Sequence, residues 1–249
     1  MAEVLNRDAN VTGLGRLTTN RVAQITEIGV VLAVALVAIT LAQPLVGDNP
    51  LARQAVAWAA NVMMLGIVWL GLRLRGQSWK DLGLPFRFSG WQAAGRTVLQ
   101  SFLVVIAAIA AFALGSIVMA NITGIPERAD MTQYDYLRGN LPLLILALTS
   151  VYVVSSLGEE VIYRAFLITR LAALGADRAW AVRAAVAISA VVFGLVHVDW
   201  GIMGIVQTGL MGLALGISYL KVRRRLWPLV LAHAYMDTLL LVPLYLPGG

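Results

Sequence analysis

Cysteine is absent from this chain of 249 residues, and charged residues are scarce. Without cysteine the chain forms no disulfide, no catalytic thiolate and no cysteine-ligated metal site. Charged residues make up 13% of the chain and hydrophobic residues 59%, whereas soluble domains carry about 25% charged residues. The first apolar run begins near Ile28 and lacks the small-residue cleavage site of a secretory signal, so we interpret it as a retained span. The composition indicates an integral membrane protein.

Seven apolar segments approach the length of about 20 residues that a helix needs to cross a bilayer. They lie at roughly residues 28–46, 54–72, 98–120, 141–168, 181–198, 201–220 and 226–246. The connections between them are too short and polar to fold alone. The sequence therefore predicts one integral membrane domain over residues 1–249, an all-α polytopic bundle of about seven transmembrane helices, with N-terminal spans at 28–140 and four core spans at 141–246.

Lysine and arginine are distributed unequally over the predicted loops. Fifteen of the 19 lie on the side of the N-terminus, Arg164 lies within a span, and three lie on the opposite side: Arg53, Arg128 and Arg138. By the positive-inside rule the N-terminus is cytoplasmic and the C-terminus outside, in a multi-pass protein of the cell membrane. Although the net charge is +6, these short clusters between apolar runs are typical of membrane topology, and we expect no nucleic-acid partner.

Six ionisable residues fall within predicted spans. A charged side chain at the middle of a span costs about 2.5 to 3.5 kcal/mol, so such residues usually face a cavity and carry function. Both histidines of the chain are among them. The six are Glu159, Glu160, Arg164, His197, His233 and Asp237.

The spacing of these residues suggests which of them pair with each other. Glu160 and Arg164 are four apart, with the acid first, which favours an ion pair on one helix face. Glu159 then lies about 100° around the helix and is free to face another environment. The alternative for Glu160 and Arg164 is a purely structural buried ion pair that fixes the helix register.

The two histidines each have a neighbour one helical turn away. Phe193 precedes His197 by four residues, which stacks the ring on the imidazole, and His233 precedes Asp237 by four. Asp199, in a turn, is interpreted as a solvated loop acid. A single histidine in a span often only bonds a neighbouring helix, so the argument for a site depends on three helices each contributing polar groups.

These residue types fit hydrolysis of a peptide bond within the membrane. A partly desolvated Glu159 is a strong enough base to deprotonate a water that it holds with His197. His233 and Asp237 could orient a carbonyl and stabilise the charge that grows on its oxygen. An ionised aspartate cannot donate a hydrogen bond, so Asp237 would have to be protonated, hold the His233 tautomer, or bind a metal.

The stretches EEVIYR, FGLVH and HAYMD resemble, in order and helix placement, the motifs EExxxR, FxxxH and HxxxN. These motifs belong to the CAAX-protease and bacteriocin-processing (CPBP, or Abi) family of intramembrane proteases. The resemblance covers about residues 141–246, and the SWKDLGLPF stretch at 78–86 is similar to the family's W–LGL loop. It implies an intramembrane endopeptidase with Glu159 as general base, His197 as its partner in holding the water, and His233 with Asp237 as the oxyanion site. Glu160, Arg164 and Phe193 would be supporting residues.

The third motif departs from the family pattern, because Asp237 stands where asparagine is usual. Histidine and acid side chains are good zinc ligands, so the alternative to a glutamate-type protease is a metallo-endopeptidase with Zn²⁺ held by Glu159, His197 and His233. We favour a mechanism with no obligatory metal. The expected partners are membrane lipid and a membrane-associated peptide or protein that arrives from the bilayer or the cytoplasmic face, and the sequence does not determine the oligomeric state.

Two other functions use the same residues. A proton-coupled transporter would use the acids and histidines as a relay, but the spans show no paired halves. A non-catalytic immunity or scaffold protein would need them only to join helices. 

Two further expectations concern geometry. With a rise of 1.5 Å per residue, His197 lies roughly 9 Å deeper than the other groups if its helix starts at Arg183, so that helix is shifted or tilted, or the turn at 199–201 dips into the membrane. We expect the groups to meet in a cavity nearer the cytoplasmic half. Gly212 and Gly216 form a GxxxG that is expected to bring the last two spans together.

Overall fold

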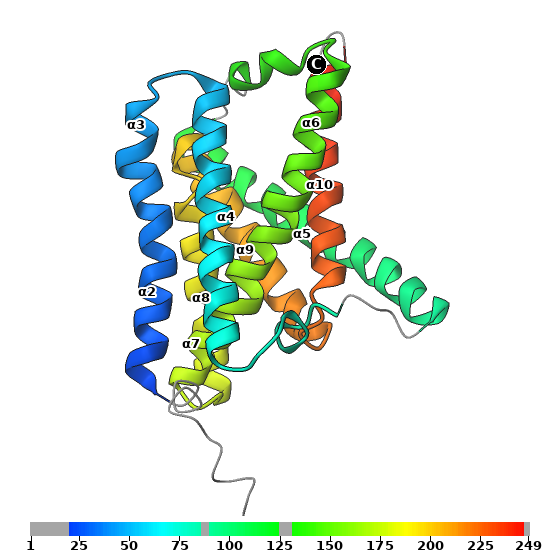
Figure 1. The fold of residues 1–249 in the computed structure, drawn as a ribbon. Helices are drawn as coiled ribbons and strands as arrows, with labels where there is room; N and C mark the ends of the chain where they lie inside the picture. The colour runs from blue at the N-terminus through cyan, green and yellow to red at the C-terminus, as the bar shows by residue number, and fades with distance from the viewer. Residues whose placement is uncertain (1–19, 86–89, 125–130, 247–249) are drawn as a thin grey trace, which may run out of the picture.

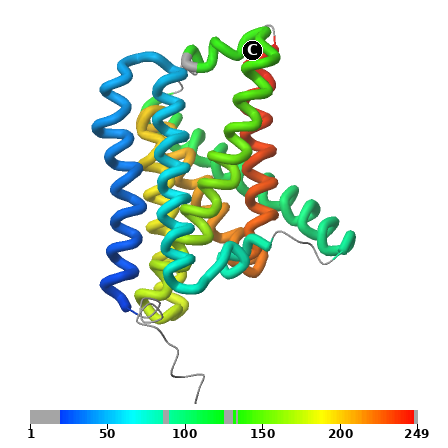
Figure 2. The backbone as a smooth tube through the Cα atoms, viewed as in Figure 1, coloured from blue at the N-terminus to red at the C-terminus, as the bar shows by residue number. Residues whose placement is uncertain are grey.

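Helices account for every regular element in the described part of the chain. The structure, a computed structural model, describes residues 20–85, 90–124 and 131–246, and Figures 1 and 2 show an upright bundle with one strongly tilted helix, α5. Seven apolar helical segments follow one another in the expected order. They are Arg21–Leu45, Pro50–Leu74 (α4), Trp91–Thr123 (α5), Leu141–Leu174, Ala179–Leu195 (α8), Val198–Lys221 and Trp227–Tyr245 (α10). The prediction of a polytopic all-α membrane bundle is confirmed.

The segment α8 differs from the other six. It has 17 residues, whereas each of the other six has at least 18 and is long and apolar enough to cross a membrane. The predicted span at 181–198 ended too late, because α8 ends at Leu195 and a short 3₁₀ turn, η7 (Val198–Trp200), follows. The last residues of that apolar run therefore form a turn and not a helix.

Asparagine side chains begin three of the long helices. The first segment consists of α2 (Arg21–Val37), η2 (Ala38–Ala42) and α3 (Gln43–Leu45). Asn20 Oδ1 accepts hydrogen bonds from Val22 N and Ala23 N, at 2.9 and 3.2 Å. Asn49 caps α4 with Pro50 at the first helical position, and Asn140 caps α6 (Leu141–Val151). Such a cap satisfies backbone N–H groups that have no partner within the helix.

The fourth segment is the centre of the bundle. After α6 it continues as two π-helical stretches, η5 (Tyr152–Leu157) and η6 (Glu160–Ile168), and ends as α7 (Thr169–Leu174). All nine residues of η6 are buried, and they pack against α8, α9 (Gly201–Lys221) and α4. π-Helical geometry is rare and frequently occurs at functional sites.

Glycines allow α9 to pack closely on α8. A Cβ on Gly212 would lie 3.0 Å from the Phe193 ring, and one on Gly216 would lie 2.9 Å from Val186. The expectation that this GxxxG joins the last two spans is wrong, because both glycines face the preceding helix, α8. The missing side chain of Gly212 leaves room for the ring of Phe193.

The loop before α5 supports the start of α10. A 3₁₀ turn, η3 (Trp79–Leu82), is closed by a capping box between Ser78 and Asp81. Gly83 follows with φ of +79°, and its carbonyl accepts a hydrogen bond from Leu226 N at 2.9 Å. Glycine is required there, because a side chain would collide with the Arg224 carbonyl. The W–LGL stretch thus fixes the N-terminal end of the helix that carries His233.

Candidate active site

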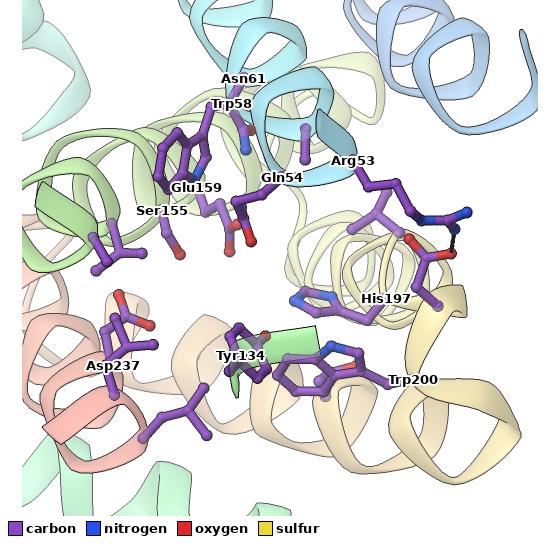
Figure 3. A pocket seen from close by; sticks show the side chains of 18 of the residues that line it. Arg53, Gln54, Trp58, Asn61, Tyr134, Ser155, Glu159, His197, Trp200 and Asp237 are labelled. Carbon is purple, nitrogen blue, oxygen red and sulfur yellow. Dashed lines mark hydrogen bonds and ion pairs between the residues drawn. The ribbon is translucent and has the colours of Figure 1, made fainter. Parts of the chain in front are cut away.

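A cavity of about 830 Å³ opens between the N-terminal helices and the central segment. Figure 3 shows side chains from α4, the fourth segment, the α8–α9 turn and α10 facing one another across it. All four candidate catalytic residues line this cavity: Glu159, His197, His233 and Asp237. The structure therefore brings together the groups that the sequence placed on three separate helices.

The two adjacent glutamates have different surroundings. The Glu160 side chain has 0% of its surface exposed and Glu159 13%. Glu160 Oε1 lies 3.4 Å from Arg164 Nη1, so the expected ion pair is present. The Arg164 guanidinium also lies over the Phe193 ring, 4.0 Å from its centroid, a cation–π arrangement. Glu159 lines the cavity, and its Oε2 has no hydrogen-bond partner among the described residues.

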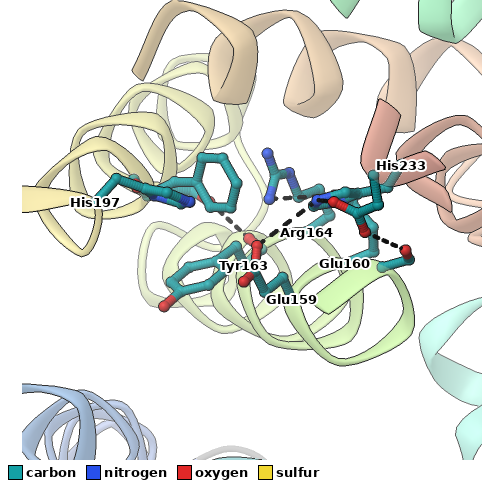
Figure 4. A network of polar contacts seen from close by, with 10 residues as sticks. Glu159, Glu160, Tyr163, Arg164, His197 and His233 are labelled. Carbon is teal, nitrogen blue, oxygen red and sulfur yellow. Dashed lines mark hydrogen bonds and ion pairs between the residues drawn. The ribbon is translucent and has the colours of Figure 1, made fainter. Parts of the chain in front are cut away.

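His233 lies among three carboxylates (Figure 4). Its Nδ1 is 2.8 Å from Glu160 Oε1, and because a carboxylate accepts, the ring donates from Nδ1. Its Nε2 is 3.8 Å from Glu159 Oε2 and 3.9 Å from Asp237 Oδ1. Glu160 therefore contacts His233 directly, in addition to Arg164, and orients the ring so that Nε2 is directed toward the other two acids.

Asp237 has a partner that the sequence analysis missed. Ser156 Oγ donates a hydrogen bond of 2.6 Å to Asp237 Oδ2, and Ser156 is fully buried in η5. The signal in the sequence was the pair Ser155–Ser156 one turn before Glu159, but only the approach of α10 to η5 shows which serine reaches the acid. Asp237 accepts this bond, so its Oδ1 is the oxygen nearer to His233.

His197 lies in the turn beyond α8, two residues after the helix ends. The ring stacks on Phe193, with centroids 4.8 Å apart, as expected from their spacing. Its Nδ1 lies 2.7 Å from the Phe193 carbonyl oxygen. Since a carbonyl only accepts, Nδ1 carries the hydrogen and Nε2 is the free nitrogen. The sequence analysis expected a shifted or tilted helix, or a turn that dips toward the site. In the structure His197 lies in the turn after the helix, and this turn reaches the cavity that Glu159 also lines.

The cavity lies toward the end of the bundle with the α3–α4 connection, whereas the sequence analysis expected it nearer the end with most of the basic loops. Asp199 lines its edge and forms an ion pair of 2.8 Å with Arg53 at the start of α4. Asp199 is therefore not the isolated loop acid that the sequence suggested. The dashed line in Figure 3 marks this pair.

One wall of the cavity comes from α4, outside the segment that carries the motifs. Gln54, Trp58 and Asn61 line it and are directed into it in Figure 3. The sequence signal was a polar stripe at i, i+4 and i+7 on an apolar helix, which a search for charged residues did not register.

A tyrosine in the α5–α6 connection lies at the cavity edge. Tyr134, in η4 (Thr132–Leu137), lines the cavity beside Trp200. Burial raises the pKa of Tyr134 to about 12, so its hydroxyl stays protonated at neutral pH and can donate a hydrogen bond.

The suggested metal ligands do not form a ready metal site. Among the described residues no group of three or more histidine, aspartate or glutamate side chains is arranged to hold a metal ion. Glu159, His197 and His233 therefore do not fit a zinc site in the arrangement that the structure shows.

Comparisons with known proteins identify the segment that carries the site. A family model described as type II CAAX prenyl endopeptidase Rce1-like matches residues 141–239, which include every candidate residue from Glu159 to Asp237. Searches of curated proteins and of solved structures found no match. The match supports a CAAX-protease-like endopeptidase and leaves the catalytic type open. The segment 141–239 is therefore similar to the Rce1-like family, and the resemblance based on the three motifs is confirmed.

Proposed function

We propose that this protein is an intramembrane endopeptidase in which Glu159 activates the water that cleaves the peptide bond. The observation that carries the proposal is the environment of Glu159: its carboxylate borders an 830 Å³ cavity, while the adjacent Glu160 is fully buried beside Arg164 and His233. A carboxylate that borders such a cavity without an arginine partner is available for proton transfer.

Glu159 and His197 would hold the attacking water between them. His197 Nε2 can accept a hydrogen bond because Nδ1 donates to the Phe193 carbonyl. Glu159 takes one proton from the water as its oxygen bonds to the carbonyl carbon of the substrate. When the C–N bond breaks, Glu159 returns this proton to the leaving nitrogen. Glu159 is then ready for the next reaction in its original ionised form.

His233 would stabilise the oxyanion. With Nδ1–H directed at Glu160, a protonated His233 donates from Nε2 to the developing negative charge. Asp237, held by Ser156, would favour this charged ring electrostatically. This role does not require Asp237 to donate, and so it suits an aspartate where the family pattern has asparagine.

We also propose that no metal is obligatory and that the substrate is a membrane-associated peptide or protein. The spacing of the suggested ligands supports the metal-free mechanism, because among the described residues no three histidine, aspartate or glutamate side chains are arranged to hold a metal ion. Metal analysis of the purified protein, with activity measured before and after chelation, tests this. Activity that is lost on chelation and restored by Zn²⁺ would contradict it.

The experiment that tests the function is cleavage of a membrane-tethered reporter. The purified protein is reconstituted with single-span reporters that carry a pooled library of unstructured segments of about ten residues next to the span. We expect cleavage by the wild-type protein and none by Glu159→Gln or His197→Ala. Equal cleavage by the variants would end the proposal, and proton uptake by the liposomes without cleavage would favour the transporter.

A further inference from the structure

The cavity extends from the candidate catalytic residues to one end of the bundle. Seven of its lining residues are exposed. Five lie in or next to three chain connections: Asp48, Pro50, Thr132, Asp199 and Trp200; the other two, Ile109 on α5 and Leu239 on α10, lie on the sides of their helices. Figures 1 and 2 show these connections, those from α3 to α4, from α5 to α6 and from α8 to α9, at the same end as the C-terminal end of α10. The cavity therefore reaches this end of the bundle.

The opposite end is closed beneath the site. The closed end is the one at which α2 begins. On α4, the fourth segment, α9 and α10, the lining residues nearest to this end are Met64, Tyr163, Met211 and His233, and no described residue of these helices closer to it lines the cavity. Below them lie the rest of η6, residues 164–168, which is buried, and the buried side chains of Leu215, Tyr219 and Leu226. The η3 loop, hydrogen-bonded to Leu226 N through Gly83, covers this packing. A peptide coming from that side would meet a packed core.

Basic residues mark the closed end. Of the lysines and arginines in the described residues, twelve lie at or near this end and two, Arg53 and Arg138, at the open end. Arg7, Arg16, Arg87 and Arg128 lie outside the described residues. Because basic loops stay in the cytoplasm during membrane insertion, the closed end is cytoplasmic and the open end faces outward.

We infer that the site takes its substrate from the outer, non-cytoplasmic face of the membrane. The substrate class is then an extended segment of a secreted or membrane-anchored protein, next to its span or anchor and on the outer side, and not the C-terminus of a cytoplasmic protein. This inference rests on the proposed protease function and replaces the expectation of entry from the cytoplasm. The main-chain amides of such a segment would meet Gln54 and Asn61, whose side chains have no hydrogen bond to any described residue.

The natural absence of cysteine allows a direct test of the orientation. Asp48→Cys adds a thiol at the cavity opening, and Lys80→Cys adds one to the η3 loop; both positions are exposed. In intact cells a membrane-impermeant maleimide should label Asp48→Cys and should label Lys80→Cys only after permeabilisation. The reverse pattern would overturn the inference, whatever the protein does.

Reporters of two orientations then separate this inference from the proposed function. The same segment library is placed next to the reporter's span, on the outer face in one pool and on the cytoplasmic face in the other. We expect cleavage of the outer pool at least tenfold above the cytoplasmic pool, and loss of both signals in Glu159→Gln. Cleavage of the cytoplasmic pool alone, or of both pools equally, overturns the inference and leaves the protease function standing. No cleavage of either pool contradicts the protease function and the inference with it.

Discussion

Two clusters of charged side chains lie inside the bundle, and they differ in what surrounds them. The cavity cluster consists of Glu159, Glu160, Arg164, His233 and Asp237. The closed cluster consists of Glu27, Arg75, Gln77 and Arg170, and joins α2, the C-terminal end of α4 and α7. In the closed cluster Glu27 Oε1 lies 2.8 Å from Arg75 and Oε2 lies 3.1 Å from Arg170. None of its members lines the large cavity.

The difference is one of charge balance and access. Glu27 has a cation on each carboxylate oxygen, and Gly71 leaves the space that its carboxyl group occupies. The cavity cluster has three carboxylates around one arginine and one histidine, and Glu159 faces open volume. A buried charge with matched partners stabilises helix packing, whereas an acid that lacks an arginine partner and borders a cavity is available for chemistry. Burial of charge by itself therefore does not distinguish a structural cluster from a catalytic one.

Neutralising Glu159 should have the largest effect on activity. Glu159→Gln keeps the shape of the side chain but removes the base, and general-base catalysis contributes about 10²- to 10⁴-fold. We expect reporter cleavage to fall by that factor while the unfolding temperature in detergent stays within a few degrees of wild type. If the variant instead has a clearly lower unfolding temperature and the protein that remains folded is fully active, Glu159 has a structural role in helix packing, as we assign to Glu27.

Neutralising Glu27 should have the opposite signature. Glu27→Gln leaves Arg75 and Arg170 buried without their acid, and removal of one partner of a buried ion pair costs about 3 to 5 kcal/mol. We expect a clear drop in the unfolding temperature and an unchanged kcat for the protein that remains folded. A large loss of kcat at full stability would mean that the closed cluster is part of the mechanism.

Removing the partner of Asp237 should have an intermediate effect. Ser156→Ala deletes the 2.6 Å hydrogen bond to Asp237 Oδ2, and a bond to a charged group contributes about 1.5 to 3 kcal/mol. If this bond positions the acid beside His233, kcat falls about 10- to 100-fold with KM unchanged. Thr97→Ala is the matched control, because Thr97 is also buried and its hydroxyl donates at 2.9 Å, but to a carbonyl of its own helix. Equal kcat in the two variants would rule out a positioning role for Ser156.

The ion pair at the cavity opening should contribute least to stability. Arg53 and Asp199 have 34% and 40% of their side-chain surfaces exposed, and exposed pairs contribute at most about 1 kcal/mol. Arg53→Gln should therefore shift the unfolding temperature by less than about 4 °C, and less at high salt. A shift as large as that of Glu27→Gln would show that burial is not what separates the two ion pairs.

Local properties of the sequence predicted much of the fold and the candidate site. Long apolar runs fix the helical class and the order of the segments, since backbone groups in lipid must be satisfied within a helix. The four-residue spacings of Glu160 with Arg164 and of Phe193 with His197 predicted contacts that the structure contains. Both interactions join residues that are four apart on one helix or at its end. Helical geometry alone brings such residues together, so the sequence is enough to predict them.

Contacts between distant helices were decided by the tertiary structure alone. Glu27 and Arg170 lie just outside the predicted spans 28–46 and 141–168, and they meet inside the bundle only because α2 packs beside α7. The partnership of Ser156 with Asp237, the α4 wall and the end at which the cavity opens likewise depend on how helices far apart in sequence pack and tilt. Helical periodicity fixes which face a side chain occupies, but it does not fix which helix that face meets.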